Sequence, residues 1–411
     1  MQPNQELIPH LFRNEFSKIV AVLTQLFGLE NMEIAEDIVS DTFLLAAETW
    51  GKKGVPENPT AWLYTVAKNK TKDLLKRNQL FNKKIAPKLV PAQAESAEIE
   101  IDLTEKNITD SQLQMMFTLC HPCIPTEAQV GLSLRILCGF GIDEIAEAFL
   151  SNKETINKRL FRAKEKLRIE GIKMEIPAEA EIEKRLAAVL TTLYLLFNEG
   201  YYSSTQNLPL RKDLCIESMR LTLMLIEYKP TNQPLVNALL SLMCFHASRF
   251  DARLNPHGEI VLYEDQDTSL WDAELIKRGE YYLYKAAVGN ELSKYHIEAA
   301  IAYWHTQKIN EAEKWNNILQ LYNKLLQVEY SPVAALNRTY ALARAQSPNI
   351  AIKEAEKLKL INNHLYFSLL GELHLDIAPN KALEYFQLAL SKAKNDNDRQ
   401  VIQAKIDKLA C

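Results

Sequence analysis

The sequence has 411 residues, which is too long for one compact domain and predicts two to four domains. Hydrophobic residues make up 47% of the sequence, enough to fill well-packed cores. The formal net charge of −4 excludes a uniformly basic nucleic-acid binder, so any positive potential that holds a nucleic acid must be confined to particular helices.

The sequence predicts a cytoplasmic protein that does not contact a membrane. Its first residues include Pro3, Asn4, Gln5 and Glu6 and do not resemble a signal peptide. The longest apolar stretch, Leu186–Phe197, is too short to cross a bilayer.

The hydrophobic pattern predicts an all-α fold. Nearly every periodic segment has helical spacing, and no run of alternating β-branched residues indicates a sheet. A content of 12 glycines also fits helices joined by short turns.

In chain order, the first informative segment is an acidic-edged helix expected at Ala35–Trp50. Apolar and small side chains are expected on one side, at Ile34, Ile38, Thr42 and Leu45. An acidic edge is expected on the other side, at Asp37, Asp41 and Glu48.

A basic helix is expected at Trp62–Arg77, and Asn58 stands in position to cap its start. One face carries the apolar residues Leu63, Val66, Ala67 and Leu74, and nearly the opposite face carries Lys68, Asn69, Lys72 and Lys76. Taken alone, this pattern fits a solvated lysine face better than nucleic-acid binding, so it does not establish the latter.

A helix-turn-helix is expected farther along the chain. A short helix over Gly141–Phe149 is followed by a turn at Ser151 and Asn152, where Asn152 can cap a second helix at Glu154–Arg168. The second helix places Ile156, Leu160, Ala163 and Leu167 on one stripe, which predicts a buried face. Its other side carries polar residues that can read base edges or contact phosphates, Thr155, Asn157, Lys158 and Arg162 among them.

The order of these segments resembles the extracytoplasmic-function (ECF) class of bacterial RNA polymerase sigma factors. The resemblance to sigma region 2 covers about residues 10–80, through Ala35-Glu36-Asp37 with Asp41 and Phe43, and through Pro59-Thr60-Ala61-Trp62-Leu63-Tyr64. The resemblance to region 4 covers about residues 111–170, through Glu144-Ile145-Ala146-Glu147 and Lys158-Arg159-Leu160. The chain departs mildly from the family pattern at Ser40, where sigma factors commonly have Gln.

The resemblance implies a role for each segment. The acidic-edged helix would bind the clamp helices of the largest subunit of core RNA polymerase, through Asp37, Asp41, Phe43 and Glu48. The basic helix would engage the −10 element of promoter DNA, through Trp62, Lys68, Asn69, Lys72 and Lys76. The second helix of the helix-turn-helix would read the −35 element, through Thr155, Asn157, Lys158, Arg159 and Arg162, and its domain would contact the polymerase flap.

Sequence composition suggests where the domains divide. The resemblance and these patterns together predict region 2 at residues 1–85, a linker at 86–110, region 4 at 111–173, a helical extension domain at 180–325 and TPR-like repeats at 326–411. The repeat prediction depends on Leu370-Gly371, Ala382, Phe386 and Ala389, which have nearly tetratricopeptide spacing, and on a weaker copy that starts 34 residues earlier, near Leu336.

The six cysteines favour buried thiols over a metal or redox site. Cys120 and Cys123 have the spacing that binds zinc, but no second pair follows at a suitable distance. We therefore expect no metal and no cofactor.

The segment between residues 190 and 310 combines His246, Arg249, Glu264, Asp265 and Asp267 with aromatic residues. These side chains could line a ligand pocket or hold a metal. The favoured alternative is structural, with buried ion pairs and with Asp267 or Asp272 as helix caps.

The sequence therefore favours a sigma factor that binds core polymerase and promoter DNA, performs no catalysis itself and carries a helical, regulatory extension with an unknown protein or ligand partner. A one-component DNA-binding regulator or scaffold with a helical-repeat sensor domain is the alternative. A third reading, an enzyme centred on His246, is disfavoured because the sequence contains no nucleophile elbow or phosphate loop.

Overall fold

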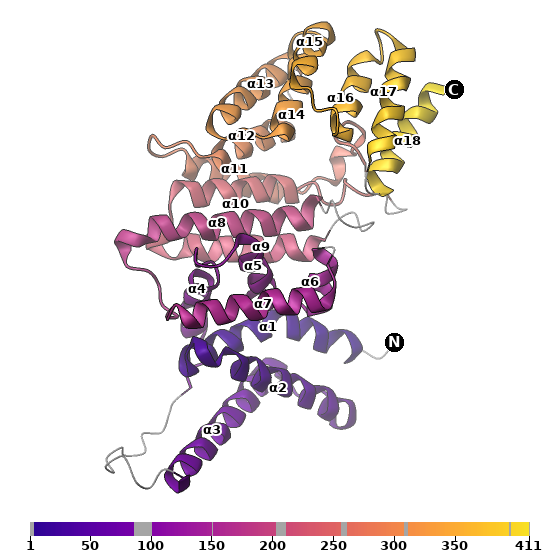
Figure 1. Cartoon of the computed structure of the whole chain (residues 1–411). Helices are drawn as coiled ribbons and strands as arrows, with labels where there is room; N and C mark the ends of the chain where they lie inside the picture. The colour runs from indigo at the N-terminus through magenta and orange to yellow at the C-terminus, as the bar shows by residue number, and fades with distance from the viewer. Residues whose placement is uncertain are drawn as a thin grey trace. The chain divides into compact units, whose positions relative to one another are not determined.

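A computed structural model describes residues 4–85, 101–149, 151–202, 211–255, 261–307, 311–393 and 396–410. In these ranges every regular element is a helix, which confirms the all-α prediction (Figure 1). No helix in them is both long and apolar enough to span a membrane. The chain forms two compact units, Met1–Thr192 and Leu193–Cys411.

The described residues of the first unit form seven α-helices, two short helical turns and the beginning of an eighth α-helix. In chain order they are α1 (Asn4–Phe27), η1 (Leu29–Asn31), α2 (Met32–Lys53), α3 (Pro59–Ile85), α4 (Glu105–Leu119), α5 (Thr126–Leu132), η2 (Ser133–Leu137), α6 (Ile142–Ala148), α7 (Lys153–Ile169) and the first part of α8 (Glu179–Tyr202).

An aromatic cluster fixes the packing of α1 on α2. Phe12 stacks on Phe16 with ring centroids 4.6 Å apart and meets the edge of Phe43 at 5.0 Å. Phe16 is fully buried. Such aromatic pairs add stability beyond the apolar area they bury, so this cluster sets the angle at which the two helices cross.

The expected linker at residues 86–110 is too long at its C-terminal end. Helix α4 begins at Glu105, and both Ile101 and Leu103 before it are buried. Asp102 accepts a hydrogen bond from the backbone N–H of Thr104 and thereby orders the approach to α4. The rest of the predicted linker, residues 86–100, lies outside the described residues.

Where the structure describes it, the second unit contains the end of α8 and ten further α-helices. These are α9 (Lys212–Glu227), α10 (Pro234–Ala247), α11 (Ala273–Ala286), α12 (Lys294–Thr306), α13 (Glu311–Val328), α14 (Pro332–Ala345), α15 (Pro348–Leu358), α16 (His364–His374), α17 (Pro379–Lys392) and α18 (Asp396–Ala410). Three short turns lie among them, η3 (Lys229–Thr231), η4 (Tyr263–Asp265) and η5 (Thr268–Leu270).

Helix pairs form the repeats that the sequence predicts. The copy near Leu336 is the pair α14–α15, and the copy at Leu370 is the pair α16–α17. Small residues of both pairs have no exposed surface: Ala351 and Ala355 in one pair, and Ala382 and Ala389 in the other. Helices that stack in this way need small side chains where their axes come close.

Two predicted domain boundaries do not match the structure. The division at 325/326 falls inside α13, and one buried cluster continues from Ile297 on α12 to Leu373 on α16, so no domain boundary lies there. The predicted extension begins at residue 180, whereas the compact units divide at 192/193, inside α8.

Gly371 provides a test of the repeat packing. A Cβ at this position would lie 2.6 Å from a ring carbon of the fully buried Phe386. Gly371→Ala should therefore destabilise the second unit by about 1–3 kcal/mol through overpacking. A lower melting temperature of this unit in thermal unfolding of the full chain would support the packing.

Gly51→Ala is the matched control. Gly51 also lies in a helix, but no atom would lie within 4 Å of its added Cβ. This substitution should stabilise the first unit by up to about 1 kcal/mol, because alanine loses less backbone entropy than glycine in a helix. Equal melting shifts for the two variants would show that the close contact at Gly371 is not a constraint.

Candidate nucleic-acid and polymerase interfaces

Helix α7 has the two faces that its sequence predicts. Ile156, Leu160, Ala163 and Leu167 are all buried. The side chain of Asn152 accepts a hydrogen bond from the backbone N–H of Thr155 at 2.7 Å and so caps the helix, as expected. Helix α5 packs closely beneath α7, since a Cβ on Gly131 would lie 3.0 Å from the side chain of Leu160.

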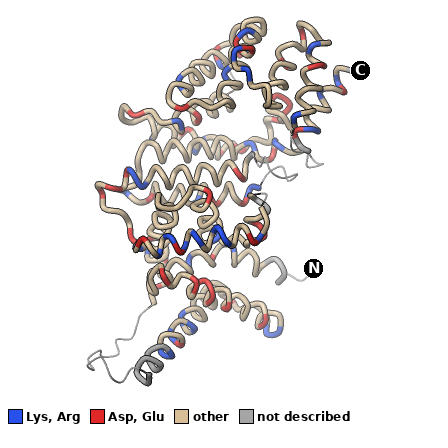
Figure 2. The backbone as a smooth tube through the Cα atoms, in the orientation of Figure 1, with Lys and Arg blue, Asp and Glu red and all other residues tan. Residues whose placement is uncertain are grey.

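The outward face of α7 is polar and basic. Thr155, Asn157, Lys158 and Arg162 are exposed, while Arg159 is half-buried with its guanidinium 5.7 Å from the centre of the Phe149 ring. Figure 2 shows the basic residues spaced along α7. This arrangement leaves four of the five predicted side chains free to approach a duplex, with the N-terminal turns of the helix carrying most of them.

Helix α3 exposes part of its predicted set. Asn69, Lys72 and Lys76 are exposed, whereas Lys68 is half-buried. Trp62 is also half-buried, and its ring meets that of Trp50 on α2 at 5.3 Å. Asn58 caps α3, as expected, by accepting a hydrogen bond from the backbone N–H of Ala61.

The acidic edge of α2 is present, but Phe43 does not belong to it. Asp37, Asp41 and Glu48 are exposed, whereas Phe43 is only 4% exposed and packs against Phe12. The prediction that Phe43 contacts a partner directly is therefore wrong, because its side chain is in the core between α1 and α2.

An exposed leucine stands within this acidic edge instead. Leu44 is 59% exposed, and its spacing of seven, three and four residues from Asp37, Asp41 and Glu48 places it on their face of the helix. Leu45, which was expected to face the core, is also exposed. The spacing of Leu44 from the acids fits the polar face, but the position of α1 is needed to decide whether Phe43 or Leu44 is buried.

A buried carboxylate joins the two halves of the first unit. Glu36 on α2 is 8% exposed and forms ion pairs with Arg135 at 3.3 Å and with Lys164 on α7. At a half-exposed position nearby, Arg13 on α1 pairs with Glu144 on α6 at 2.6 Å. No sequence pattern indicates this network, because ion pairs separated by about a hundred residues or more leave no local signal.

Hydrogen bonds and one cation–π contact also connect the helix-turn-helix half to the α1–α2 half. Gln112 on α4 donates a hydrogen bond to the hydroxyl of Ser17 on α1, at 3.1 Å and in a buried position. Ser111 donates to the side-chain oxygen of Gln25 at 2.7 Å. The guanidinium of Arg13 lies 4.5 Å from the centre of the Phe140 ring. The helix-turn-helix half is therefore packed against the α1–α2 half.

The cysteines match the expectation of buried thiols. Cys120, Cys138, Cys215 and Cys244 are buried, and Cys123 is half-buried, while Cys411 lies outside the described residues. Burial raises the pKa of Cys120 to about 11, so this thiol stays protonated at neutral pH. Among the described residues no three His, Cys, Asp or Glu side chains gather as a metal site would require.

Comparison with known proteins identifies two segments of the chain. Residues 11–81 match the Sigma-70 region 2 family, and residues 185–287 match a family of unknown function (DUF6596). The chain is also 32% identical over 386 residues to the uncharacterized protein R00370 of Rhizobium meliloti (strain 1021), an alignment that covers 92% of this chain and 91% of that protein. No solved structure matches.

Proposed function

We propose that this chain, which belongs to the sigma-70 family of transcription initiation factors, is a sigma factor of the ECF type with a helical C-terminal extension. The observation that carries the proposal is the region 2 match at residues 11–81 followed, in the same unit, by a capped and exposed recognition helix. Sigma factors bind core RNA polymerase and direct it to promoters, and the polymerase performs the chemistry.

Helices α3 and α7 are the proposed DNA-reading elements. The exposed residues Asn69, Lys72 and Lys76 suit contacts with the −10 element, and the exposed face of α7 suits the major groove at the −35 element. Lys158 and Arg162 lie four residues apart, one turn along the same face, so both can contact DNA at once.

The edge of α2 is the proposed polymerase-docking surface. It combines the carboxylates of Asp37, Asp41 and Glu48 with the exposed Leu44. An apolar residue surrounded by charges is the composition expected of a specific interface with a polar rim. In this proposal the acids orient the factor on the polymerase clamp and Leu44 contributes buried apolar area.

Reading both elements at once requires the first unit to open. Elements at −10 and −35 are about 25 base pairs apart, which is about 85 Å of B-form DNA. A compact unit of 192 residues has a radius of gyration of only about 16 Å. The helix-turn-helix half must therefore separate from the α1–α2 half, which breaks the ion pairs of Glu36.

The recognition helix can be tested by alanine substitution. Arg162→Ala and Lys158→Ala should each weaken binding to the upstream promoter element, since one arginine–guanine pair gives about 1–3 kcal/mol of discrimination. Footprinting of the holoenzyme on promoter DNA measures the effect. Lys184→Ala, which removes an exposed charge on α8, is the control and should leave the footprint intact. An unchanged upstream footprint in the Lys158/Arg162 double variant would remove α7 from this role.

The docking surface can be tested by charge reversal. Asp37→Lys combined with Asp41→Lys should slow association with core polymerase and weaken the complex, because reversed rim charges repel a complementary partner. Surface-immobilised core enzyme at low salt gives the association rate, and circular dichroism checks helix content.

The matched control reverses two exposed acids elsewhere in the first unit, Glu175 and Glu183. It should associate as the wild type does. Equal association rates for the two double variants would assign polymerase binding to another surface.

The closed joint can be tested at Glu36. Glu36→Gln keeps the shape of the side chain but removes the charge that Arg135 and Lys164 neutralise, so the free protein should open more often and show a larger radius of gyration in solution scattering. Glu217→Gln is the control, since Glu217 is similarly buried but pairs with Arg220 inside the second unit. Identical scattering curves for wild type and both variants would show that this network does not hold the joint.

A further inference from the structure

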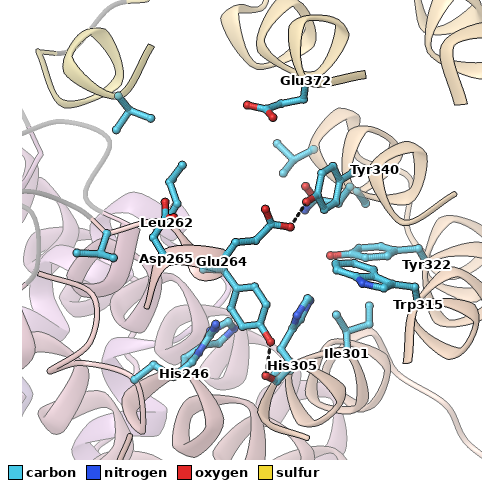
Figure 3. A pocket seen from close by; sticks show the side chains of 18 of the residues that line it. His246, Leu262, Glu264, Asp265, Ile301, His305, Trp315, Tyr322, Tyr340 and Glu372 are labelled. Carbon is cyan, nitrogen blue, oxygen red and sulfur yellow. Dashed lines mark hydrogen bonds between the residues drawn. The ribbon is translucent and has the colours of Figure 1, made fainter. Parts of the chain in front are cut away.

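The second unit encloses a cavity of about 1080 Å³. Helices α8, α10, α12 and α13 contribute to its wall together with residues 261–265, and α14, α16, α17 and α18 contribute the rest. Figure 3 shows Glu264, His305, Trp315 and Tyr340 around one open space. This volume is in the range of pockets that bind small molecules.

Much of the wall is apolar or aromatic. Ile301, Ala302, Trp315, Tyr322 and Leu325 line the side formed by α12 and α13. The ring of Trp315 meets His305 at 5.7 Å and Tyr340 at 5.5 Å, both edge-to-face, which holds these aromatic groups in fixed positions. A flat or apolar ligand body would find complementary surface here.

Arg249 is a buried cation on this wall without an anionic partner. It is 8% exposed, and among the described residues no carboxylate forms an ion pair with it. Its Nη2 approaches only the hydroxyl of Tyr201 at 3.5 Å and Nδ1 of His246 at 3.4 Å, and its Nε has no hydrogen-bond partner. Buried charges in proteins are normally paired, and the described residues supply no anion for Arg249, so a bound anion would satisfy it.

A second buried cation reinforces the positive potential beside the cavity. Lys314 is 5% exposed and donates a hydrogen bond to the hydroxyl of Tyr263 at 2.9 Å. The Tyr263 ring has the guanidinium of Arg249 at 5.4 Å and the ammonium of Lys314 at 5.2 Å from its centre. No ion pair to Lys314 is found within the described ranges.

Three acidic residues of the wall do not neutralise these cations, and the fourth, Asp265, is exposed and forms no ion pair among the described residues. Glu264 pairs with Arg344 at 2.6 Å and accepts a hydrogen bond from Tyr340, and Glu372 pairs with Lys405. Burial raises the pKa of Glu298 to about 7, so this carboxyl carries only part of its charge at neutral pH.

Two half-buried histidines also remain uncharged. Burial, aided by Arg249, lowers the pKa of His305 to about 3 and that of His246 well below its usual value. His305 Nδ1 is buried and has no hydrogen-bond partner in the described structure. A neutral imidazole can both donate and accept a hydrogen bond, so this nitrogen suits a ligand rather than a further protein contact.

The other acids of this segment have structural roles, as the sequence interpretation favoured. Asp267 accepts a hydrogen bond from the backbone N–H of Ser269, and Asp272 accepts from those of Glu274 and Leu275 at the start of α11. They are helix caps. The unexplained groups are therefore Arg249 and His305, both on the cavity wall.

We propose that this cavity binds a small organic anion, with its carboxylate or phosphate group at Arg249 and a planar apolar body against Trp315 and Tyr322. An anion at Arg249 would supply the charge that the described structure lacks there, and the body would bury apolar surface. This inference concerns the extension and does not depend on the proposed polymerase binding.

The test uses the fluorescent aromatic anion 8-anilinonaphthalene-1-sulfonate (ANS) as probe on the full-length protein. ANS should bind at one site, and indole-3-carboxylate or phenyl phosphate should displace it. Whichever of the two competes at lower concentration identifies the preferred anionic group. The neutral indole-3-carboxamide should compete at least tenfold more weakly, because it lacks the charge that Arg249 would pair.

Arg249→Gln should weaken ANS binding at least tenfold, and Arg249→Lys should retain part of the affinity because it keeps the charge. Arg278→Gln, which removes an exposed arginine from α11, is the matched control and should bind as the wild type does. Circular dichroism checks that each variant is folded. Equal competition by the carboxamide on wild-type protein, or unchanged affinity in a folded Arg249→Gln variant, would overturn the proposal.

Discussion

The arrangement of the first unit depends on one buried carboxylate. Glu36 is removed from water and receives both Arg135 and Lys164, which belong to the helix-turn-helix half. A buried charge is tolerated only where ion pairs and hydrogen bonds offset the lost hydration, so neither cation can leave without a large cost. The contact of Glu36 with Arg135 and Lys164 therefore fixes how the two halves pack together. In the proposed opening, this is the contact that would break.

In the proposed function, α7 would serve both the closed and the open state. Lys164 faces α2 and holds the closed joint, while Lys158 and Arg162 face solvent and are available to DNA. A helix that presents different residues on different faces can change partners without refolding. Opening would separate Lys164 from the carboxylate of Glu36 and leave its positive charge unpaired on the helix-turn-helix half. The proposed open form would therefore attract DNA more strongly and could also span more widely separated promoter elements.

Periodicity predicted the helices of this chain well, because a packed helix must place its apolar residues on one stripe. The buried stripe of α7, its Asn152 cap and the small residues of the repeats all followed from spacing alone. Phe43 and Leu44 show the limit of this reasoning. Adjacent positions differ by 100° on a helix, and deciding which of two neighbouring apolar residues is buried requires knowing where α1 lies.

The ion pairs of Glu36 could not be predicted, since they bring together residues from distant segments. The sequence raised a pocket at His246, Arg249, Glu264 and Asp265 as an alternative, but it could not supply the part of the wall that α13 and later helices form. Although the ion-pair partners of Glu36 are far from it in the sequence, the three residues are expected to change together in evolution. Positions 36, 135 and 164 act as one electrostatic unit, because losing the acid leaves two cations without a partner and losing one cation weakens the neutralisation of the acid. Relatives of this chain are expected to keep or exchange the three residues together. Co-variation of these positions among relatives would show which of them have the same contact between the two halves.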